Sequence, residues 1–298
     1  GVGYLAAALR QEGYEAEIID CHCYHLGCDD AVSILSRRNP SIIGFSVLEE
    51  GWDGAREIIR RLRAAGVNAH ITMGGHFPTL SYREVLGELD GALDSIVRGE
   101  GERAIVELAG RIKRRVDWRD IPGIAYVESG TVHTTPTPPL VEPLDSLAPP
   151  SRDHLERIVG WGGSPYFVTG RGCYGSCSFC SINAFYRASP GKKIRLREPE
   201  KVADEIEAVI RRYRTPFIYF NDDTFLIPGR AGRERVARLF DDLERRGLKF
   251  RFGFSCRAND VEHELFAMLK SKGLVFVYLG IESMNDQVLA LYRKRNTA

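Results

Sequence analysis

The stretch Arg171-Gly-Cys-Tyr-Gly-Ser-Cys-Ser-Phe-Cys180 carries three cysteines, Cys173, Cys177 and Cys180, separated by three and then by two residues. At this spacing a single loop can turn three thiols toward one small volume. Four thiolates saturate a cubane iron–sulfur cluster, so a loop that offers three leaves one iron open. The glycines of the stretch let the backbone bend around a bulky inorganic group. The stretch therefore predicts a 4Fe-4S cluster with one open coordination position.

Two other interpretations of these cysteines fit less well. A structural zinc site usually has four ligands in paired CxxC spacings, and no fourth partner lies nearby in the sequence. A disulfide with one spare thiol suits a secreted chain. The seven cysteines are an odd number and no secretion signal is visible, which predicts reduced thiols in the cytoplasm.

The CxxxCxxC spacing, with the aromatic Phe179 directly before the last cysteine, resembles the radical S-adenosylmethionine (radical SAM) superfamily. The resemblance implies that S-adenosylmethionine (SAM) binds the open iron and is cleaved reductively to a 5′-deoxyadenosyl radical. It also implies a one-electron reductant partner such as flavodoxin or ferredoxin.

The composition is that of an ordinary globular protein. The 298 residues are 44% hydrophobic and 27% charged, enough for about two domains. The net charge of +1 gives no field for a polyanion, so nucleic acid is not expected as a partner. No apolar run approaches the roughly 20 residues that span a bilayer. A small-molecule substrate fits this composition.

The first part of the chain, residues 1–120, alternates short apolar runs with amphipathic segments. This alternation predicts a doubly wound parallel sheet, a Rossmann-like domain whose first strand would precede Gly1. The expected strands are Ala16–Asp20, Ser41–Val47, Ala69–Met73 and Ser95–Arg98, and the expected helices are Tyr4–Gln11, Asp29–Arg38, Gly54–Ala65, Tyr82–Leu89 and Glu102–Arg115.

Residues 121–160 form the expected boundary between two domains. Ile124–Thr134 has the pattern of a hairpin that turns at Ser129-Gly130. Thr135–Pro150 then holds six prolines in sixteen residues, which predicts an extended linker.

Residues 161–298 alternate again, and the resemblance implies that they form the first four units of a (β/α)6 radical SAM barrel whose C-terminal end is missing. The basic run Lys192–Arg197 after the cysteines predicts a solvated face that a reductant could use. The expected strands are Tyr166–Thr169, Phe217–Phe220, Phe250–Ser255 and Val275–Gly280, and the expected helices are Pro199–Tyr213, Gly232–Arg246, Glu262–Lys272 and Asp286–Arg293.

Polar residues follow three of these strands, where ligands of parallel sheets bind. Asp222 or Asp223 could accept from an ammonium group, and Arg257, two residues after Ser255, could pair with a carboxylate. Glu282 could accept from ribose hydroxyls or the ammonium. These positions match what the resemblance implies for SAM binding. The alternative is that they cap the following helices.

The expected N-terminal sheet ends in three loops that contain glycine or small residues. Such loops allow close approach to a large, flat ligand. They resemble the cobalamin-binding domain that precedes the barrel in one branch of the superfamily, in which these stretches line the corrin and its nucleotide tail. The alternative is a flavodoxin-like domain that binds a nucleotide or nothing. The residues concerned are Ser46, Val47, Gly74, Gly75, His76, Gly99, Glu100 and Gly101.

Two further features concern metals and thiols. Cys21, His22, Cys23, His25 and Cys28 form a dense group of soft ligands, but their spacing matches no standard zinc site. The Asp-x-His-x-x-Gly motif that places a histidine on cobalt is not seen, so no lower axial ligand is assigned. Cys256, next to Arg257, is expected to be a buried small residue rather than a reactive thiol.

The leading interpretation is a cobalamin-dependent radical SAM enzyme that methylates an unactivated carbon, using methylcobalamin and a 5′-deoxyadenosyl radical. A cyclase or ring-rearranging enzyme of the same branch is the first alternative, and a non-catalytic cofactor-binding fragment is the second. Natural-product intermediates, lipids and tetrapyrroles all fit as substrates.

Overall fold

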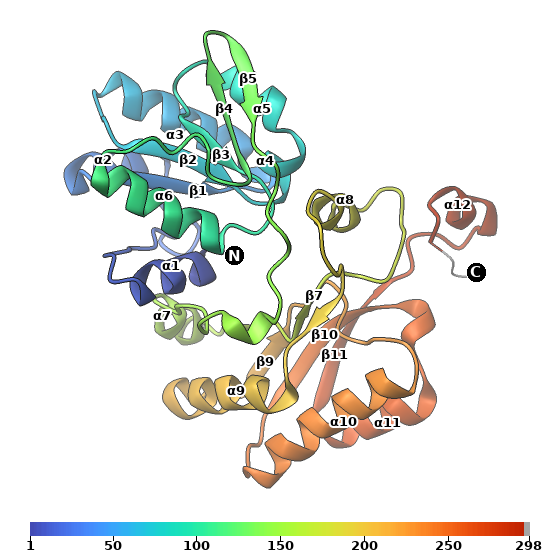
Figure 1. The fold of residues 1–298 in the computed structure, drawn as a ribbon. Coiled ribbons are helices and arrows are strands. Elements are labelled where there is room, and N and C mark those ends of the chain that lie inside the picture. The colour runs from blue at the N-terminus through green and yellow to red at the C-terminus, as the bar shows by residue number, and fades with distance from the viewer. Residues whose placement is uncertain (295–298) are drawn as a thin grey trace. The chain divides into compact units, whose positions relative to one another are not determined.

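A computed structural model describes residues 1–294 of the chain (Figure 1). The chain forms two compact units, each with its own sheet. Unit 1 comprises Gly1–Val141, Leu147–Asp153 and Ala184–Gly191, and unit 2 comprises Glu142–Ser146, His154–Asn183 and the chain from Lys192 onward.

The sheet of unit 1 has five strands in the order β1-β2-β3-β4-β5. The first three are parallel, and a hairpin adds two antiparallel strands beside β3. Ser129 and Gly130 both have positive φ at the hairpin turn, which confirms the predicted hairpin. The strands are β1 (Ile42–Ser46), β2 (His70–Gly74), β3 (Ser95–Val97), β4 (Ile124–Glu128) and β5 (Thr131–Thr134).

Helices cover both faces of this sheet (Figure 1). Neighbouring strand residues point to opposite faces, so Ile96 packs with one helix layer and Val97 with the other. The first layer contains α2 (Cys28–Arg38), α3 (Trp52–Ala64) and α5 (Tyr82–Leu89), and the second contains α1 (Val2–Gln11) and α6 (Glu102–Arg114). The prediction of a doubly wound sheet is confirmed.

One predicted strand is wrong. Residues 16–20 form no strand, and none of their side chains is fully buried. A strand exists only with a paired neighbour, and no strand within residues 1–294 pairs with this segment. The sequence pattern of Ala16–Asp20 was therefore not sufficient to predict a strand there.

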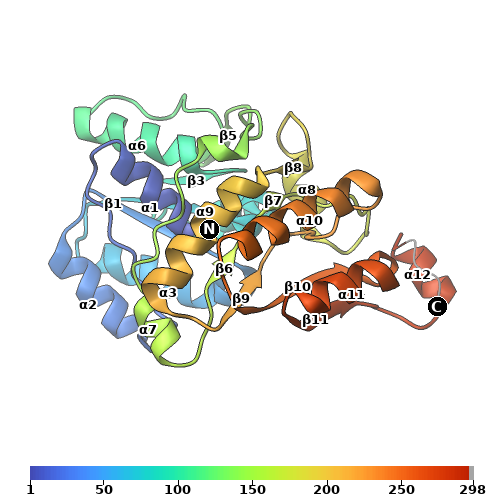
Figure 2. The ribbon, with the colours of Figure 1, turned by 90° about the horizontal axis from the view of Figure 1, so that it is seen from below.

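The sheet of unit 2 has four parallel strands in the order β11-β10-β9-β6. Three helices lie against one of its faces, as Figure 2 shows for α9, α10 and α11. The strands are β6 (Tyr166–Phe167), β9 (Phe217–Phe220), β10 (Arg251–Arg257) and β11 (Leu274–Gly280), and the helices are α9 (Pro199–Tyr213), α10 (Arg230–Arg245) and α11 (His263–Ser271).

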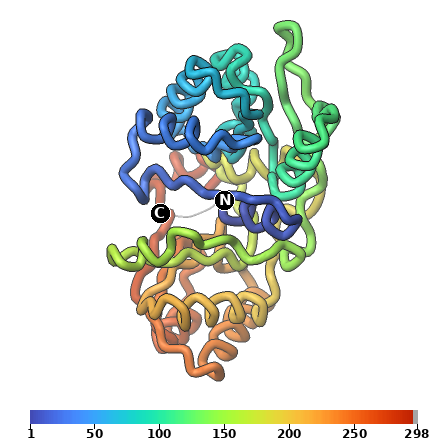
Figure 3. Tube along the Cα trace, turned by 90° about the vertical axis from the view of Figure 1, so that its left-hand side faces the viewer, coloured from blue at the N-terminus to red at the C-terminus, as the bar shows by residue number. Residues whose placement is uncertain are grey.

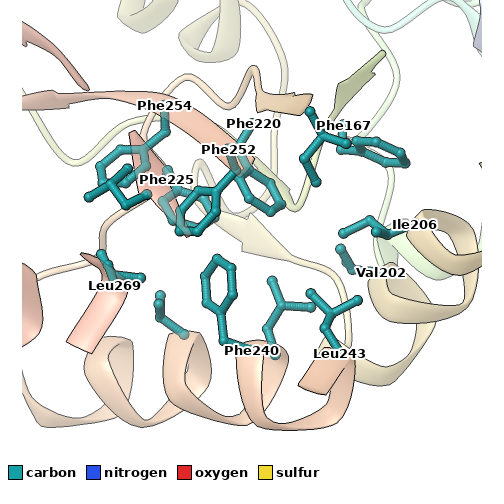
Figure 4. Close-up of a cluster of buried hydrophobic side chains, with 14 of the residues drawn as sticks. Phe167, Val202, Ile206, Phe220, Phe225, Phe240, Leu243, Phe252, Phe254 and Leu269 are labelled. Atoms are coloured by element: carbon teal, nitrogen blue, oxygen red, sulfur yellow. The ribbon is translucent and has the colours of Figure 1, made fainter. Parts of the chain in front are cut away.

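Phenylalanine rings fill the space between this sheet and its helices (Figure 4). Phe240 of α10 stacks on Phe252 of β10, with 4.5 Å between ring centroids, and Phe220 of β9 stacks on Phe225 at the same distance. All four rings are at most 2% exposed. Truncating one such ring to alanine typically costs about 3–5 kcal/mol. This core fixes the strands whose ends carry the site.

Short elements complete the two units, and the course of residues 135–150, which includes a short 3-10 helix, can be followed in Figure 3. Within residues 1–294 no helix has both the length and the apolar character needed to cross a bilayer. The short elements are η1 (Glu49–Gly51), α4 (His76–Leu80), η2 (Leu144–Ser146), α7 (Leu155–Gly160), β7 (Gly170–Arg171), α8 (Ser181–Arg187), β8 (Arg195–Leu196), η3 (Ala258–Asp260) and α12 (Asp286–Leu291).

Candidate functional site

The cysteine loop of unit 2 starts at β7, which pairs with β8. Gly172 has a φ of +92°, and a side chain there would overlap the carbonyl of Lys193, so only glycine fits. The next residue, Cys173, accepts a hydrogen bond at Sγ from the Gly175 N–H at 3.3 Å. Burial raises the pKa of the Cys173 thiol, and this N–H opposes the shift. A bound metal would displace the thiol proton.

Arg257 donates from Nη1 to Cys177 Sγ at 3.2 Å. Its guanidinium lies 5.4 Å from the centre of the Tyr174 ring. The Tyr174 hydroxyl donates to Asp260 Oδ1, and Asp260 Oδ2 accepts from the Arg257 N–H at 3.2 Å. Burial and the hydrogen bond to Asp260 raise the pKa of Tyr174. The end of β10 and η3 thus hold a cation beside the second cysteine.

The last part of the loop is held by the segment around the end of α12. The Ser178 N–H donates to the Tyr292 carbonyl at 2.9 Å. The Phe179 ring is 52% exposed and meets the Tyr292 ring edge-on, with 5.3 Å between centroids. Cys180 follows, and α8 begins at the next residue.

These contacts fit an iron–sulfur cluster. All three cysteines are free and partly exposed. Within residues 1–294 no three His, Cys, Asp or Glu side chains converge as one metal ion requires. Each thiolate of a cubane binds a different iron, so that convergence is not needed. The N–H donors at Cys173 and Cys177 are the contacts that tune such clusters.

Two neighbouring carboxylates at the end of β9 face the start of the loop. Asp222 Oδ1 accepts from both the N–H and the hydroxyl of Thr169, at 2.8 and 2.9 Å. Asp223 Oδ2 accepts from the Gly172 N–H at 2.8 Å. Asp222 is 9% exposed, and burial raises its pKa to about 7. Both residues therefore contact the protein's own backbone just before Cys173.

The other strand-end residues also have partners in the protein. Ser255 Oγ lies 2.6 Å from the Tyr219 hydroxyl. Glu282 Oε1 accepts from Lys294 Nζ at 3.0 Å, and the Lys294 carbonyl accepts from Arg257. Lys294 is 4% exposed, so it links the ends of β10 and β11 from a buried position. A SAM-binding role for Ser255 and Glu282 stays a prediction.

The basic run after the cysteines is not the solvated face that was predicted. Arg195 is 3% exposed and Arg197 is 9% exposed. Arg197 pairs with Asp145 at 3.1 Å and with Glu205 at 2.6 Å. Strand pairing with β7 turns these side chains inward, while Lys192 remains exposed. The run anchors the linker to unit 2.

In unit 1 the three predicted loops lie at the carboxyl ends of β1, β2 and β3. The Val47 N–H donates to the Gly74 carbonyl at 3.1 Å, directly after Ser46 ends β1. Gly75 has a φ of +108°, and a Cβ there would lie 3.1 Å from the Val47 carbonyl. His76 begins α4, and its ring stacks on Phe185 at 4.1 Å.

The third loop is equally tight. Gly99 has a φ of +82°, its N–H donates to Thr79 Oγ1 at 3.1 Å, and a Cβ would lie 3.0 Å from Ser189 Oγ. Glu100 Oε2 accepts from the Val141 N–H at 2.6 Å, and Gly101 caps α6. The glycines thus also serve close packing within unit 1.

Two family models match the chain, one in each half. Residues 1–109 match the B12 binding domain, and residues 167–298 match the radical SAM superfamily. The chain joins a B12 binding domain to a radical SAM domain.

Curated relatives resemble the chain over nearly all of its length. An uncharacterized methyltransferase of Pyrococcus horikoshii is 29% identical, with 99% of this chain and 62% of the relative covered. The anaerobic magnesium-protoporphyrin IX monomethyl ester cyclase of Cereibacter sphaeroides is 28% identical, with 99% and 49% covered. The hopanoid C-3 methylase of Methylococcus capsulatus is 25% identical, with 99% and 55% covered. The chain thus spans about half to two thirds of each relative.

Solved structures share the fold. The cobalamin-dependent SAM radical enzyme OxsB, with aqua-cobalamin and SAM bound, superposes with a TM-score of 0.81 at 25% identity, covering 99% of this chain and 43% of that chain. The radical SAM methyltransferase TsrM from Kitasatospora setae, with cobalamin and a 4Fe-4S cluster bound, has a TM-score of 0.78 at 20% identity, covering 99% and 61%.

The soft-ligand group lies in the B12 binding domain. Cys23 is 4% exposed and its N–H donates to Asp20 Oδ1, while burial raises the pKa of Cys21. In the radical SAM domain, Cys256 is 8% exposed and burial raises its pKa to about 12. Cys256 is thus a buried core residue, as predicted.

Sequence reasoning missed four residues that hold the cysteine loop: Tyr174, Thr169, Asp260 and Lys294. Tyr174 lies inside the motif, so its aromatic ring was a visible signal. Thr169 contacts Asp222 across 53 positions of sequence, and Asp260 contacts Tyr174 across 86. Lys294 is a buried lysine that contacts Glu282 and Arg257. No local sequence pattern indicates any of these contacts.

Proposed function

We propose that the chain is the cofactor-binding part of a cobalamin-dependent radical SAM enzyme that methylates an unactivated carbon. The observation that carries the proposal is the cysteine loop, with its N–H donors at Cys173 and Cys177, following a B12 binding domain. Because the chain spans about half to two thirds of its curated relatives, the activity of the whole protein is part of this proposal.

Cys173, Cys177 and Cys180 are proposed to hold a 4Fe-4S cluster, and Phe179 to border it. The cofactors supply an electron that cleaves SAM to a carbon radical, and a methyl group from methylcobalamin. The chain's own residues orient these groups and exclude water. Arg257 adds a positive charge beside one thiolate.

Five strand-end residues are proposed to contact SAM. Glu282 is the best placed to accept from its ribose or ammonium group, since Lys294 is the one side-chain partner that it has within residues 1–294. Arg257 would offer its guanidinium to the carboxylate, with Ser255 beside it on β10. Asp222 Oδ1 and Asp223 Oδ2 already accept from backbone N–H groups, so a contact of either residue to the SAM ammonium would use the second carboxylate oxygen.

In the B12 binding domain, the loops after β1, β2 and β3 are proposed to contact cobalamin. Their residues are Ser46, Val47, Gly74, Gly75, His76, Gly99, Glu100 and Gly101. The support is their position at the carboxyl ends of parallel strands, where α/β sheets bind ligands. A cytoplasmic location and a flavodoxin or ferredoxin as reductant belong to the same proposal.

The first test is anaerobic cofactor retention by the 298-residue chain. The chain is reconstituted with iron and sulfide, incubated with hydroxocobalamin, desalted and read by absorbance. Near-stoichiometric corrin with an intact cluster supports the proposal. An intact cluster without corrin would mean that the N-terminal domain has another role. Methyl transfer from cobalamin would then be rejected as the reaction.

The similarity to the cyclase of Cereibacter sphaeroides favours a second candidate, an oxidative ring closure. Product mass separates the two reactions, because methylation adds CH2 and cyclisation removes hydrogens. With SAM and a reductant, both give 5′-deoxyadenosine. If a longer chain of the same protein turns over and this one does not, this chain is a cofactor-binding fragment.

A further inference from the structure

Thr169 lies directly before the cysteine loop, and its N–H, hydroxyl and carbonyl all make hydrogen bonds. It is 1% exposed. Its N–H and its hydroxyl both donate to Asp222 Oδ1, at 2.8 and 2.9 Å. Its carbonyl accepts from the Arg197 N–H at 2.9 Å and from Arg235 Nη2 at 2.7 Å. Four bonds therefore fix the backbone four residues before Cys173.

The neighbouring carboxylate, Asp223, contacts the backbone of the cysteine loop three residues further on. Asp223 Oδ2 accepts from the Gly172 N–H at 2.8 Å, directly before Cys173. Between these points, Gly170 lies so close to β8 that a Cβ would be 2.7 Å from Leu196 Cδ2. Two consecutive residues at the end of β9 thus determine where the strand leading into the loop can lie.

We propose that Asp222 and Asp223 are positioning residues that hold the start of the cysteine loop and thereby place the Cys173 thiolate for the cluster. The inference rests on the proposed function, because it takes the loop to carry a cluster. It differs from a contact to SAM, because Asp222 Oδ1 accepts from Thr169 directly before the loop and Asp223 Oδ2 accepts from the Gly172 N–H within it.

The contacts also say which property of Asp222 matters. Both bonds from Thr169 end on Oδ1, and Oδ2 has no hydrogen-bond partner within residues 1–294. An asparagine keeps an oxygen at the Oδ1 position, so Asp222→Asn should preserve both hydrogen bonds from Thr169. Asp222→Ala removes the acceptor and leaves two buried donors without a partner, and an unsatisfied buried donor lowers stability more than the loss of a solvated hydrogen bond.

The test compares Asp222→Ala, Asp222→Asn and Asp223→Ala with wild type. A matched control is Asp242→Ala, which removes another buried carboxylate of unit 2, on α10, whose partners are Arg245 and Arg246. Amide hydrogen exchange over residues 169–173 is measured in the cluster-free chain. Iron retention against a chelator and the electron paramagnetic resonance (EPR) spectrum of the reduced cluster are measured after reconstitution.

We expect Asp222→Ala and Asp223→Ala to speed exchange at 169–173, to alter the EPR spectrum, and to lower iron affinity by roughly 10-fold or more. Asp222→Asn should resemble wild type, and Asp242→Ala should lower thermal stability without a selective effect at 169–173. Wild-type exchange in Asp222→Ala, with only SAM affinity reduced, would overturn the inference. A wild-type chain that takes up no cluster would refute the proposed function instead, while the exchange data would still decide whether Asp222 holds the loop.

Discussion

Arg257 donates a hydrogen bond to a thiol of the cysteine loop, with 3.2 Å between Nη1 and Cys177 Sγ. Reduction adds negative charge to a cluster, so a nearby guanidinium stabilises the reduced form. A hydrogen bond to a charged group contributes about 1.5–3 kcal/mol. Since roughly 1.4 kcal/mol corresponds to about 59 mV for one electron, the effect is measurable.

We therefore expect Arg257→Gln to make the reduction potential of the cluster more negative by about 60 mV or more. An EPR-monitored redox titration without SAM measures this directly. Arg233→Gln is the control, because Arg233 also borders the cavity beside Tyr174 but pairs with Glu262. An unchanged potential in Arg257→Gln would show that the Cys177 contact does not persist around the cluster.

Gly172 and Gly229 have nearly the same positive φ, +92° and +93°, but different surroundings. A Cβ at Gly172 would overlap the Lys193 carbonyl, whereas nothing lies within 4 Å at Gly229. Gly229 has a ψ of 174°, so Gly229→Ala should cost only the strain of this backbone conformation, about 1–3 kcal/mol. Gly172→Ala should cost a further ~1–3 kcal/mol for the clash. Urea unfolding of the cluster-free chain gives both values, and equal costs would contradict the described packing.

At the scale of elements, His70 makes the sheet of unit 1 sensitive to acid. Its Nε2 lies 2.9 Å from Ser95 Oγ between β2 and β3, and the residue is 8% exposed. Burial lowers its pKa from 6.5 to about 4, with Asp94 opposing and Arg63 adding to the shift. The folded state thus holds neutral His70, and this contribution is complete above the unfolded pKa of about 6.5.

As pH falls from 6.5 toward 4, the unfolded chain binds a proton that the folded chain does not, so stability drops. The whole shift corresponds to an order-of-magnitude loss of about 3 kcal/mol. We expect His70→Gln to be less stable at neutral pH but to lose less stability over this range. Denaturant unfolding of both chains between pH 4 and 7 tests this, and parallel curves would argue against a neutral buried His70.

The helix Pro199–Tyr213 was predicted with the bounds that α9 has, because local signals sufficed: a proline in the first turn and apolar residues at Val202, Ile206 and Val209. The two-residue ladder of β7 and β8 was missed, because two residues show no periodicity. The cysteines were found from their spacing. The Arg257–Cys177 contact joins residues 80 positions apart, so it depends on the fold and no sequence pattern could show it.

At the scale of the whole molecule, the two proposed cofactor sites lie on different compact units. The cysteines belong to unit 2, and the loops after β1, β2 and β3 belong to unit 1. Each unit has its own hydrophobic core, so damage to one set of loops need not unfold the other unit. The two cofactors should therefore be separable by mutation.

Cys177→Ala should abolish iron binding while corrin is retained, because it removes a cluster ligand and Cys177 belongs to unit 2. Gly99→Leu should abolish corrin retention while iron is kept, because Gly99 has a φ of +82° and a Cβ would already press on Ser189. Gly91→Leu is the matched control, with a φ of +77° and open space around it. Iron and corrin are counted in the same desalted sample. If Cys177→Ala also lost corrin, cobalamin binding would depend on the cluster loop, and the glycine loops would not be sufficient to hold it.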